Sequence, residues 1–368
     1  MLKKEVVVVG GGPGGSSAAK KCVESGLDTL LVEKKKLPRD KVCSGMLVSD
    51  LAQDDIQSEF GIIPEEIFTS PSYLKGFMLH VPDEEPQVIK KKIPLAWRKD
   101  LDYWMNKKVM QLGGEIWDST NVKNVILESN GPIKLQIERN GRYEELVTEY
   151  LIACDGANSQ VRKRLYPELN FPYVQAYRGH YNEKIEIDRD YFHCIFPETN
   201  HHRPFFIHNK GDVFLVELSA MAGQLKKFAS RVKIVLDKEY NIDLASKPFH
   251  QDGCLMAFFL YGKLLAGDFI PAKENVLIVG EAAGLILPGT LEGIGPAIRS
   301  GIIAAQSIIK SKQGGGYADS FYITDLGGLL EKFGKADQVA RSMKEQATRG
   351  GKYLLDSYRK NMEEGFRL

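Results

Sequence analysis

Short apolar runs without polar alternation recur along the chain and are separated by segments of helical character. Such runs are typical of parallel strands buried on both faces. Their alternation with helices predicts an α/β fold built on a doubly wound sheet. The runs are Val6–Val9, Thr29–Val32, 151–154 and 275–279, and the helical segments include 16–25, 103–112 and 296–309.

Other segments alternate apolar and polar residues, which is the pattern of half-buried strands. Asn140-Gly141, a strong hairpin signal, separates two such segments, and 209–212 separates two more. The second hairpin lies in a region rich in strand patterns, for which we expect a mixed sheet. A helix at 224–240 follows, and the chain from Ala318 onward has a polar, lysine-rich helical pattern.

The first apolar run leads directly into a glycine turn with the spacing G-x-G-x-x-G, formed by Gly10, Gly12 and Gly15. The first glycine permits a tight turn, the second lets the backbone approach a pyrophosphate, and the third lets the next helix pack closely. The helix that follows offers free N–H groups to phosphate. Glu33 ends the second apolar run, eighteen residues after Gly15, where a ribose diol needs an acceptor.

A second glycine-rich segment follows the apolar run at 275–279 and extends from Gly280 to Gly295. Two nucleotide-type turns so far apart in one chain predict one long cofactor held at both ends, with the diphosphate at the first turn and the ribityl chain and isoalloxazine at the second. That cofactor is FAD. A third strand–turn–helix element lies between them, with Asp155-Gly156 in its turn and Asn158 or Ser159 as the helix cap.

These three motifs, in this order and spacing, resemble the FAD-dependent oxidoreductases of the para-hydroxybenzoate hydroxylase fold, and most closely the geranylgeranyl reductase-like branch. The resemblance covers roughly residues 1 to 310. It rests further on the loop Lys41-Val42-Cys43-Ser44-Gly45-Met46, on Arg98 ahead of a helix, and on Gly284 followed by Glu292-Gly293-Ile294.

The resemblance implies a doubly wound, Rossmann-type FAD-binding domain of residues 1–64, 92–170 and 266–310. A mixed-sheet, α+β substrate domain would comprise 65–91 and 171–265, and a C-terminal helical segment 311–368. FAD would be bound without a covalent link. The expected cofactor-binding residues are Gly10, Gly12, Pro13, Gly14, Gly15, Glu33, Lys34, Arg39, Lys41, Cys43, Gly45, Met46, Arg98, Val122, Asp155, Gly156, Glu281, Gly293 and Ile294.

Within that set, Arg39 and Lys41 are expected to neutralise the diphosphate, and Arg98 to reach the diphosphate or ribityl region. By comparison with relatives, the backbone of Val122 would contact adenine. Glu281 stands where the family usually has aspartate, and would accept a hydrogen bond from the ribityl chain. Leu291 stands where the family usually has glycine, which puts a branched side chain near the edge of the flavin.

Three side chains are the catalytic candidates. Cys43 is expected beside the flavin, where a thiol could tune the flavin, gate substrate or donate a proton; the alternative is a small packing residue. His193 and Tyr191 are candidate proton donors, with Cys194 as a further one. The adjacent His201 and His202 would point to opposite faces of a strand, so we expect no metal site there.

Bulk composition excludes some classes of protein. With 368 residues, 43% hydrophobic and 26% charged, the chain is ordinary for a globular protein of two joined domains. A net charge of +1 gives no indication of nucleic-acid binding. Five scattered cysteines indicate a reducing compartment, so we expect a cytoplasmic protein, with peripheral membrane contact left open.

The function expected from the resemblance is redox chemistry at FAD, in which a hydride passes to a carbon–carbon double bond of an apolar, isoprenoid-like substrate. NAD(P)H binding transiently, or a ferredoxin-like protein, would supply the electrons. Two alternatives remain open. One is a flavin-dependent monooxygenase or halogenase. The other is an electron-transfer flavoprotein that docks to a redox partner or quinone through the basic tail.

Overall fold

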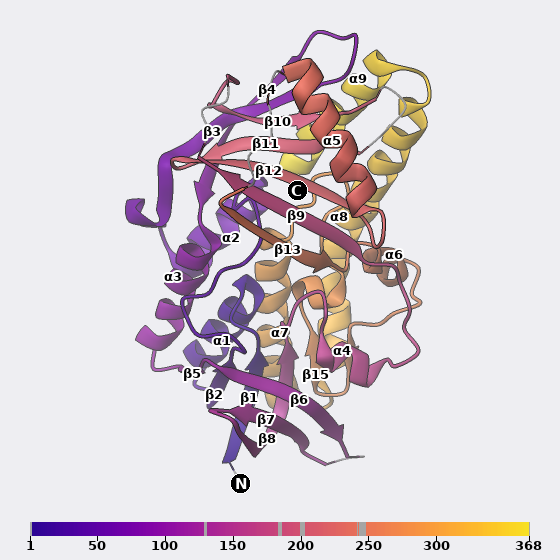
Figure 1. Cartoon of the computed structure of the whole chain (residues 1–368). Coiled ribbons are helices and arrows are strands. Elements are labelled where there is room, and N and C mark those ends of the chain that lie inside the picture. Colours follow the sequence, from indigo (N-terminus) through magenta and orange to yellow (C-terminus); the bar gives the residue numbers. More distant parts are fainter. Residues whose placement is uncertain are drawn as a thin grey trace.

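Two β-sheets lie at opposite ends of the molecule, and long helices run between them (Figure 1). The computed structural model describes residues 2–128, 131–182, 186–198, 203–240, 242 and 248–367. His201 and His202 lie outside the described residues. None of the helices in the described ranges combines the length and apolarity needed to cross a bilayer.

The first sheet is built on parallel strands in the order β5-β2-β1-β8-β15, as the unbroken apolar runs predict. Residues Val6–Val9 of β1 and the whole of β2 are buried, which is why these runs carry no polar alternation. Antiparallel strands extend it at β14 and through a β6–β7–β8 meander. The strands are β1 (Leu2–Val9), β2 (Thr29–Val32), β5 (Glu115–Trp117), β6 (Thr120–Leu127), β7 (Ile133–Arg139), β8 (Arg142–Ala153), β14 (Ala272–Lys273) and β15 (Val276–Ile278).

Helices pack around this sheet, and α1 lies against both α3 and α7. Close approach of α1 and α7 requires small residues, and a Cβ at Gly301 would lie 2.3 Å from the carbonyl oxygen of Gly14. Helix α3 begins at Arg98, five residues before the expected start. The elements are α1 (Pro13–Glu24), α2 (Asp50–Phe60), η1 (Glu65–Ile67), α3 (Arg98–Gln111), α4 (Gln160–Leu165), α6 (Leu260–Leu265), η2 (Gly280–Ala283) and α7 (Ile294–Gly314).

The second sheet is mixed, as expected: its strand order is β13-β9-β12-β11-β10-β3-β4, and only the β10–β3 pair is parallel. Helix α5 (Leu225–Tyr240) covers one face of this sheet. The opposite face is turned toward the first sheet (Figure 1). The strands are β3 (Phe68–His80), β4 (Gln87–Ala96), β9 (Val174–Tyr181), β10 (Tyr191–Ile195), β11 (Phe205–Lys210), β12 (Val213–Met221) and β13 (His250–Met256).

The C-terminal segment is helical, as expected, and it ties the two sheets together. Helix α8 (Ala318–Ala347) packs on the first core, where the Tyr322 hydroxyl donates to the carbonyl oxygen of Ile278 at 2.8 Å. Helix α9 (Gly351–Phe366) instead packs its apolar side chains on the second sheet, around Phe77 and Phe192. Although the sequence of this tail is mostly polar, its helices carry apolar side chains on one side, and these pack against the cores of the two sheets.

Candidate functional site

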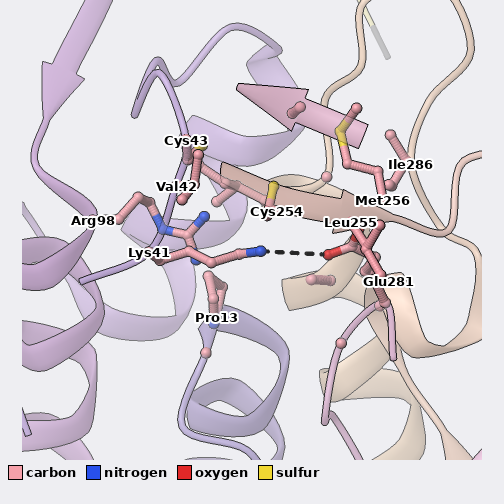
Figure 2. A pocket seen from close by; sticks show the side chains of 18 of the residues that line it. Pro13, Lys41, Val42, Cys43, Arg98, Cys254, Leu255, Met256, Glu281 and Ile286 are labelled. Atoms are coloured by element: carbon pink, nitrogen blue, oxygen red, sulfur yellow. Dashed lines mark ion pairs between the residues drawn. The ribbon is translucent and has the colours of Figure 1, made fainter. Parts of the chain in front are cut away.

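A cavity of about 1110 Å³ lies between the two sheets and is lined by residues of both. It exceeds the ~300–1,000 Å³ of ordinary small-ligand sites. The glycine turn and β2 line one end, and the loop after β2 lines the middle together with η2 and the start of α7. Strands β3, β9, β10, β11, β12 and β13 of the second sheet and helix α9 line most of the remainder. Figure 2 shows the middle of this cavity from close by.

The glycine turn has the geometry that its spacing predicts. Gly10 has a φ of +107°, and a Cβ there would lie 2.3 Å from the carbonyl oxygen of Cys154. A Cβ at Gly15 would lie 1.8 Å from the carbonyl oxygen of Gly10, so only glycine allows this strand–helix approach. Gly15 therefore shapes the turn without lining the cavity. No side chain caps the N-terminus of α1, and Gly12, Pro13 and Gly14 at this end of the helix line the cavity, so its uncapped N–H groups are available to an anion.

Glu33 is buried at the end of β2 and is held by three donors. Its Oε2 accepts from the Gly11 N–H and from Arg39 Nε, each at 2.9 Å, and its Oε1 accepts from the Lys35 N–H at 3.0 Å. A carboxylate offers about four lone-pair positions, so one remains for a single further donor such as a ribose hydroxyl.

Two arginines, Arg39 and Arg98, share the carboxylate of Asp102. Asp102 receives both of them: Arg98 Nε lies 2.7 Å from its Oδ1, and Arg39 Nη2 lies 3.3 Å from its Oδ2. Burial lowers the pKa of Arg98, but Asp102 and Cys43 outweigh burial and raise that pKa, so Arg98 stays charged. The two guanidinium groups and the N-terminus of α1 together provide positive charge that favours binding of an anionic diphosphate.

Lys41 and Glu281 face each other across the cavity above Pro13 (Figure 2), with Lys41 Nζ 3.7 Å from Glu281 Oε2. Asp155 lines the same region, and its Oδ2 accepts from the Gln160 N–H at the start of α4, at 2.7 Å. Burial raises the pKa of Asp155. The other oxygen of Asp155 is buried without a hydrogen-bond partner among the described residues, which leaves an acceptor for a ligand hydroxyl.

These observations together fit FAD. One end of the cavity offers the free lone pair of Glu33 and an open backbone at Gly12, where a Cβ would approach Arg39 Nη2 to 3.3 Å. Val122 and Lys34 line that end, and Asp155 Oδ1 is unsatisfied farther along. A long molecule with a ribose, a diphosphate and a polyol chain matches this sequence of groups.

The loop that carries Cys43 is held against the second sheet by buried cations. Arg178 Nη1 donates to the carbonyl oxygen of Cys43 at 2.7 Å, and Lys210 Nζ donates to that of Ser44. Gly45 has a φ of +77°, and a Cβ there would lie 1.9 Å from the carbonyl oxygen of Ala96. Gly45 therefore seats the loop on the end of β4 and does not line the cavity, whereas Cys43 and Met46 do.

His193 and Tyr191 do not line the cavity, in contrast to the sequence expectation. Side chains alternate along β10, and its cavity-facing residues are Phe192 and Cys194. His193 Nε2 lies 2.7 Å from the carbonyl oxygen of Asp188, and its Nδ1 lies 2.9 Å from His80 Nε2, on the face that α5 covers. Neither His193 nor Tyr191 is placed to give a proton to a ligand in the cavity.

All other residues expected at the site line this one cavity; only Gly15, Gly45, Tyr191 and His193 do not. The structure adds residues that sequence reasoning missed. Polar ones come from the second sheet, namely Arg178, Glu217, His250 and Asp252, and apolar ones are Phe77, Phe206, Tyr358 and Met362. The sequence did contain one signal for such a residue, because Glu217 is the single charged residue in the apolar strand at 213–218.

His180, His250 and Asp252 place one potential metal-ligand atom each within 4.8 Å of one another. However, both carboxylate oxygens of Asp252 already accept from Arg178, at 3.0 and 2.6 Å. A metal ion here would lie beside a guanidinium cation, so electrostatic repulsion opposes its binding.

Comparisons with known proteins find families of FAD-dependent proteins. A family model described as FAD dependent oxidoreductase matches residues 5–78, and one described as FAD binding domain matches residues 87–238. Protein CbrA of Escherichia coli (strain K12) is 23% identical over 274 residues, which is 74% of each chain.

Solved structures share the fold over the whole chain. A geranylgeranyl bacteriochlorophyll reductase-like protein from Thermoplasma acidophilum has a TM-score of 0.77 at 17% identity, covering 100% of this chain and 97% of that one. The flavin-dependent halogenase CmlS has a TM-score of 0.72 at 16% identity, covering 100% of this chain and 68% of that one. The p-nitrophenol 4-monooxygenase PnpA from Pseudomonas putida DLL-E4 has a TM-score of 0.70 at 15% identity, covering 99% and 97%.

Adjacent parts of the chain thus match two FAD-dependent family models, the fold is shared end to end, and the cavity carries the expected groups. The chain belongs to the FAD-dependent oxidoreductases of the para-hydroxybenzoate hydroxylase-like superfamily.

Proposed function

We propose that this protein is an FAD-dependent reductase or dehydrogenase that acts on carbon–carbon bonds of an apolar, isoprenoid-like substrate. The observation that carries the proposal is the apolar wall of the cavity. Phe77, Phe192 and Phe206 line it from the second sheet, and Tyr358 and Met362 line it from α9. A hydrocarbon gains about 25 cal/mol per Å² of surface that such a wall removes from water.

When bound and reduced, FAD supplies a hydride at the edge of its ring. The residues of this chain would do the rest. Leu291 and Met46 line the cavity with the apolar wall and would keep water from the reacting carbons. Saturating a double bond also requires a proton, which a side chain of the cavity wall must deliver.

The electron donor is a separate part of the proposal. NAD(P)H binding transiently and a ferredoxin-like protein are the two sources we propose to compare. Anaerobic mixing of the oxidised holoprotein with NADH, NADPH or a reduced ferredoxin, followed by flavin absorbance, identifies the source by the rate of bleaching. A donor that acts directly gives a bleaching rate that saturates with its concentration.

The reaction itself is tested by adding geranylgeraniol, as an isoprenoid probe, to the dithionite-reduced holoprotein without oxygen. The proposal predicts that flavin absorbance returns and that mass spectrometry finds a product heavier by two hydrogen atoms. Slow return of the oxidised flavin with unchanged geranylgeraniol, across a panel of shorter and longer isoprenoid alcohols, would contradict it.

A monooxygenase or halogenase is the second candidate, because CmlS and PnpA share the fold at TM-scores close to that of the reductase-like protein. Aromatic hydroxylases usually carry histidine at the position of Gly284. Here Gly284 has a φ of +81°, and a Cβ would lie 2.8 Å from Leu260. This crowding leaves no room for the histidine of the hydroxylases, which favours the reductase. Oxygen consumption coupled to a hydroxylated or halogenated product would favour the second candidate.

A further inference from the structure

Glu217 is the carboxylate that the second sheet presents to the cavity without a bidentate partner. It lies on β12, directly across from Arg178 on β9 and from Phe206 on β11, and all three side chains line the cavity. Asp252, the other carboxylate of this face, has both oxygens occupied by Arg178.

His208 lies behind Glu217 and is fully buried. Its Nδ1 is 3.2 Å from the carbonyl oxygen of Asn209. A carbonyl oxygen only accepts, so Nδ1 carries the hydrogen atom. The other ring nitrogen, Nε2, lies 3.8 Å from Glu217 Oε2 and has no hydrogen-bond partner among the described residues. A bare Nε2 lone pair facing an ionised carboxylate would be repulsive, so one proton belongs between the two groups.

The charged neighbours of this pair favour an ionised Glu217. Burial raises the pKa of Glu217, but His208, Arg178 and Lys210 outweigh burial and lower it. Lys210 lies two residues from His208 along β11 and is also buried, and burial lowers its pKa to about 8. Cys43 and Arg98 face Lys210 from the loop after β2 and from α3, and Asp252 faces Arg178 from β13.

We propose that Glu217 and His208 hold one proton between them and that Glu217 delivers it to the substrate carbon that does not receive the hydride. The inference rests on the proposed reductase function. The π bond breaks, one carbon gains the hydride of reduced FAD, and the other gains the proton through Glu217. FAD is left oxidised, and the Glu217–His208 pair is left one proton short until it regains a proton from solvent.

Other polar groups of the cavity wall fit this role less well. Cys194 and Tyr358 interact with each other, and burial raises the pKa of both groups above the ordinary range. They are therefore much weaker acids than a histidinium paired with a carboxylate. Glu217 is the catalytic residue of the pair because it faces the cavity, and His208 acts through it as a positioning and proton-storing residue.

The stored proton is tested without any substrate, by ¹⁵N NMR of histidine side chains in the FAD-bound protein. Near neutral pH we expect a histidinium signal that disappears in His208→Asn and becomes a neutral-ring signal in Glu217→Gln. Glu145→Gln, an exposed carboxylate on β8, is the matched control and should leave the signal unchanged. A neutral His208 ring in the wild-type protein would overturn the proposal.

Proton delivery is tested by anaerobic single turnover with geranylgeraniol. Glu217→Gln should slow reoxidation of the flavin by at least about 100-fold, the usual contribution of a general acid. Glu217→Asp should recover part of that loss, whereas flavin content and reduction by dithionite stay as in the Glu145→Gln control. His208→Asn should shift the pH profile of the rate. Equal rates in the wild type and Glu217→Gln would overturn the role of Glu217.

The two experiments separate this inference from the proposed function. If the wild type leaves every isoprenoid probe unchanged, the reductase function fails, and delivery to an alkene fails with it, while the NMR result still decides whether the pair stores a proton. If the wild type reduces the probe and Glu217→Gln does so equally fast, the reductase function stands and the proton comes from elsewhere.

Discussion

Lys41 Nζ lies 3.7 Å from Glu281 Oε2, and this ion pair joins the loop after β2 to the turn after β15 across the cavity (Figure 2). Lys41 belongs to the loop after the second predicted strand and Glu281 to the second glycine-rich segment, and the resemblance assigns both residues to the same cofactor. The pair therefore marks the place where the two halves of the FAD site meet, above the N-terminus of α1.

Glu281→Ala should weaken FAD binding about 2- to 12-fold, because one hydrogen bond to a ribityl hydroxyl contributes roughly 0.5–1.5 kcal/mol. Glu281→Asp should bind FAD about as well as the wild type, since it keeps the acceptor. Quenching of flavin fluorescence on titration with apoprotein measures the affinity. If alanine and aspartate bind FAD equally, Glu281 makes no bond to the cofactor.

Cys43→Ser separates the two interpretations of this side chain. The thiol faces the cavity on a loop that Arg178 and Lys210 hold, and it interacts with Arg98. A hydroxyl is less polarisable and far less acidic than a thiol, so a role in tuning the flavin predicts a shifted flavin spectrum or reduction potential in the variant. A serine variant with wild-type spectrum, potential and turnover would show that Cys43 only packs.

The stability of the fold should fall as the pH drops below about 6.5. Burial lowers the pKa of His80 to about 4, and it also lowers that of His193, which lies 2.9 Å away. Above pH 6.5 both rings are neutral whether folded or unfolded, so stability is independent of them. Between about pH 6.5 and pH 4, His80 binds a proton in the unfolded chain but not in the folded one. This difference lowers the free energy of unfolding by up to about 3 kcal/mol.

Urea unfolding at several pH values measures this loss for the wild type and for His80→Gln. The variant keeps a polar side chain that does not titrate, so the part of the pH dependence due to His80 should be missing from its curve, and the two curves should diverge between about pH 6.5 and pH 4. Parallel curves would show that His80 takes up its proton as easily in the folded chain as in the unfolded one.

Leu291→Gly should stabilise the protein by about 1 kcal/mol. Leu291 has a φ of +57°, and a left-handed backbone costs a residue with a branched side chain roughly 1–2 kcal/mol that glycine avoids. Part of that gain is lost because glycine is more flexible when unfolded. Thermal unfolding of the holoprotein measures the change, with Leu291→Ala as the control that shortens the side chain and keeps the strain.

A lower melting temperature in Leu291→Gly than in Leu291→Ala would mean that the greater flexibility of glycine in the unfolded chain outweighs the backbone strain that it relieves. Since Leu291 also lines the cavity, the same two variants show whether its side chain limits the size of the substrate: both should accept bulkier alkenes, whereas only the glycine variant should gain stability.

Local sequence determined the FAD half of the site. Strand β2 occupies the predicted residues Thr29–Val32, and Glu33 follows it at the acceptor position, because a strand buried on both faces needs an unbroken apolar run and a phosphate turn needs glycines at set positions. These requirements act within about thirty residues of chain, so they can be recognised without knowing the rest of the molecule.

Only the tertiary structure decided the substrate half. Both faces of β10 carry mostly apolar residues, so the alternation alone did not show that α5 would cover His193 and leave Cys194 to the cavity. Glu217 and His208 lie on separate strands, and only the β11–β12 register brings them to 3.8 Å. Contacts between strands depend on register and on which face is covered, and both are set by packing across the whole chain.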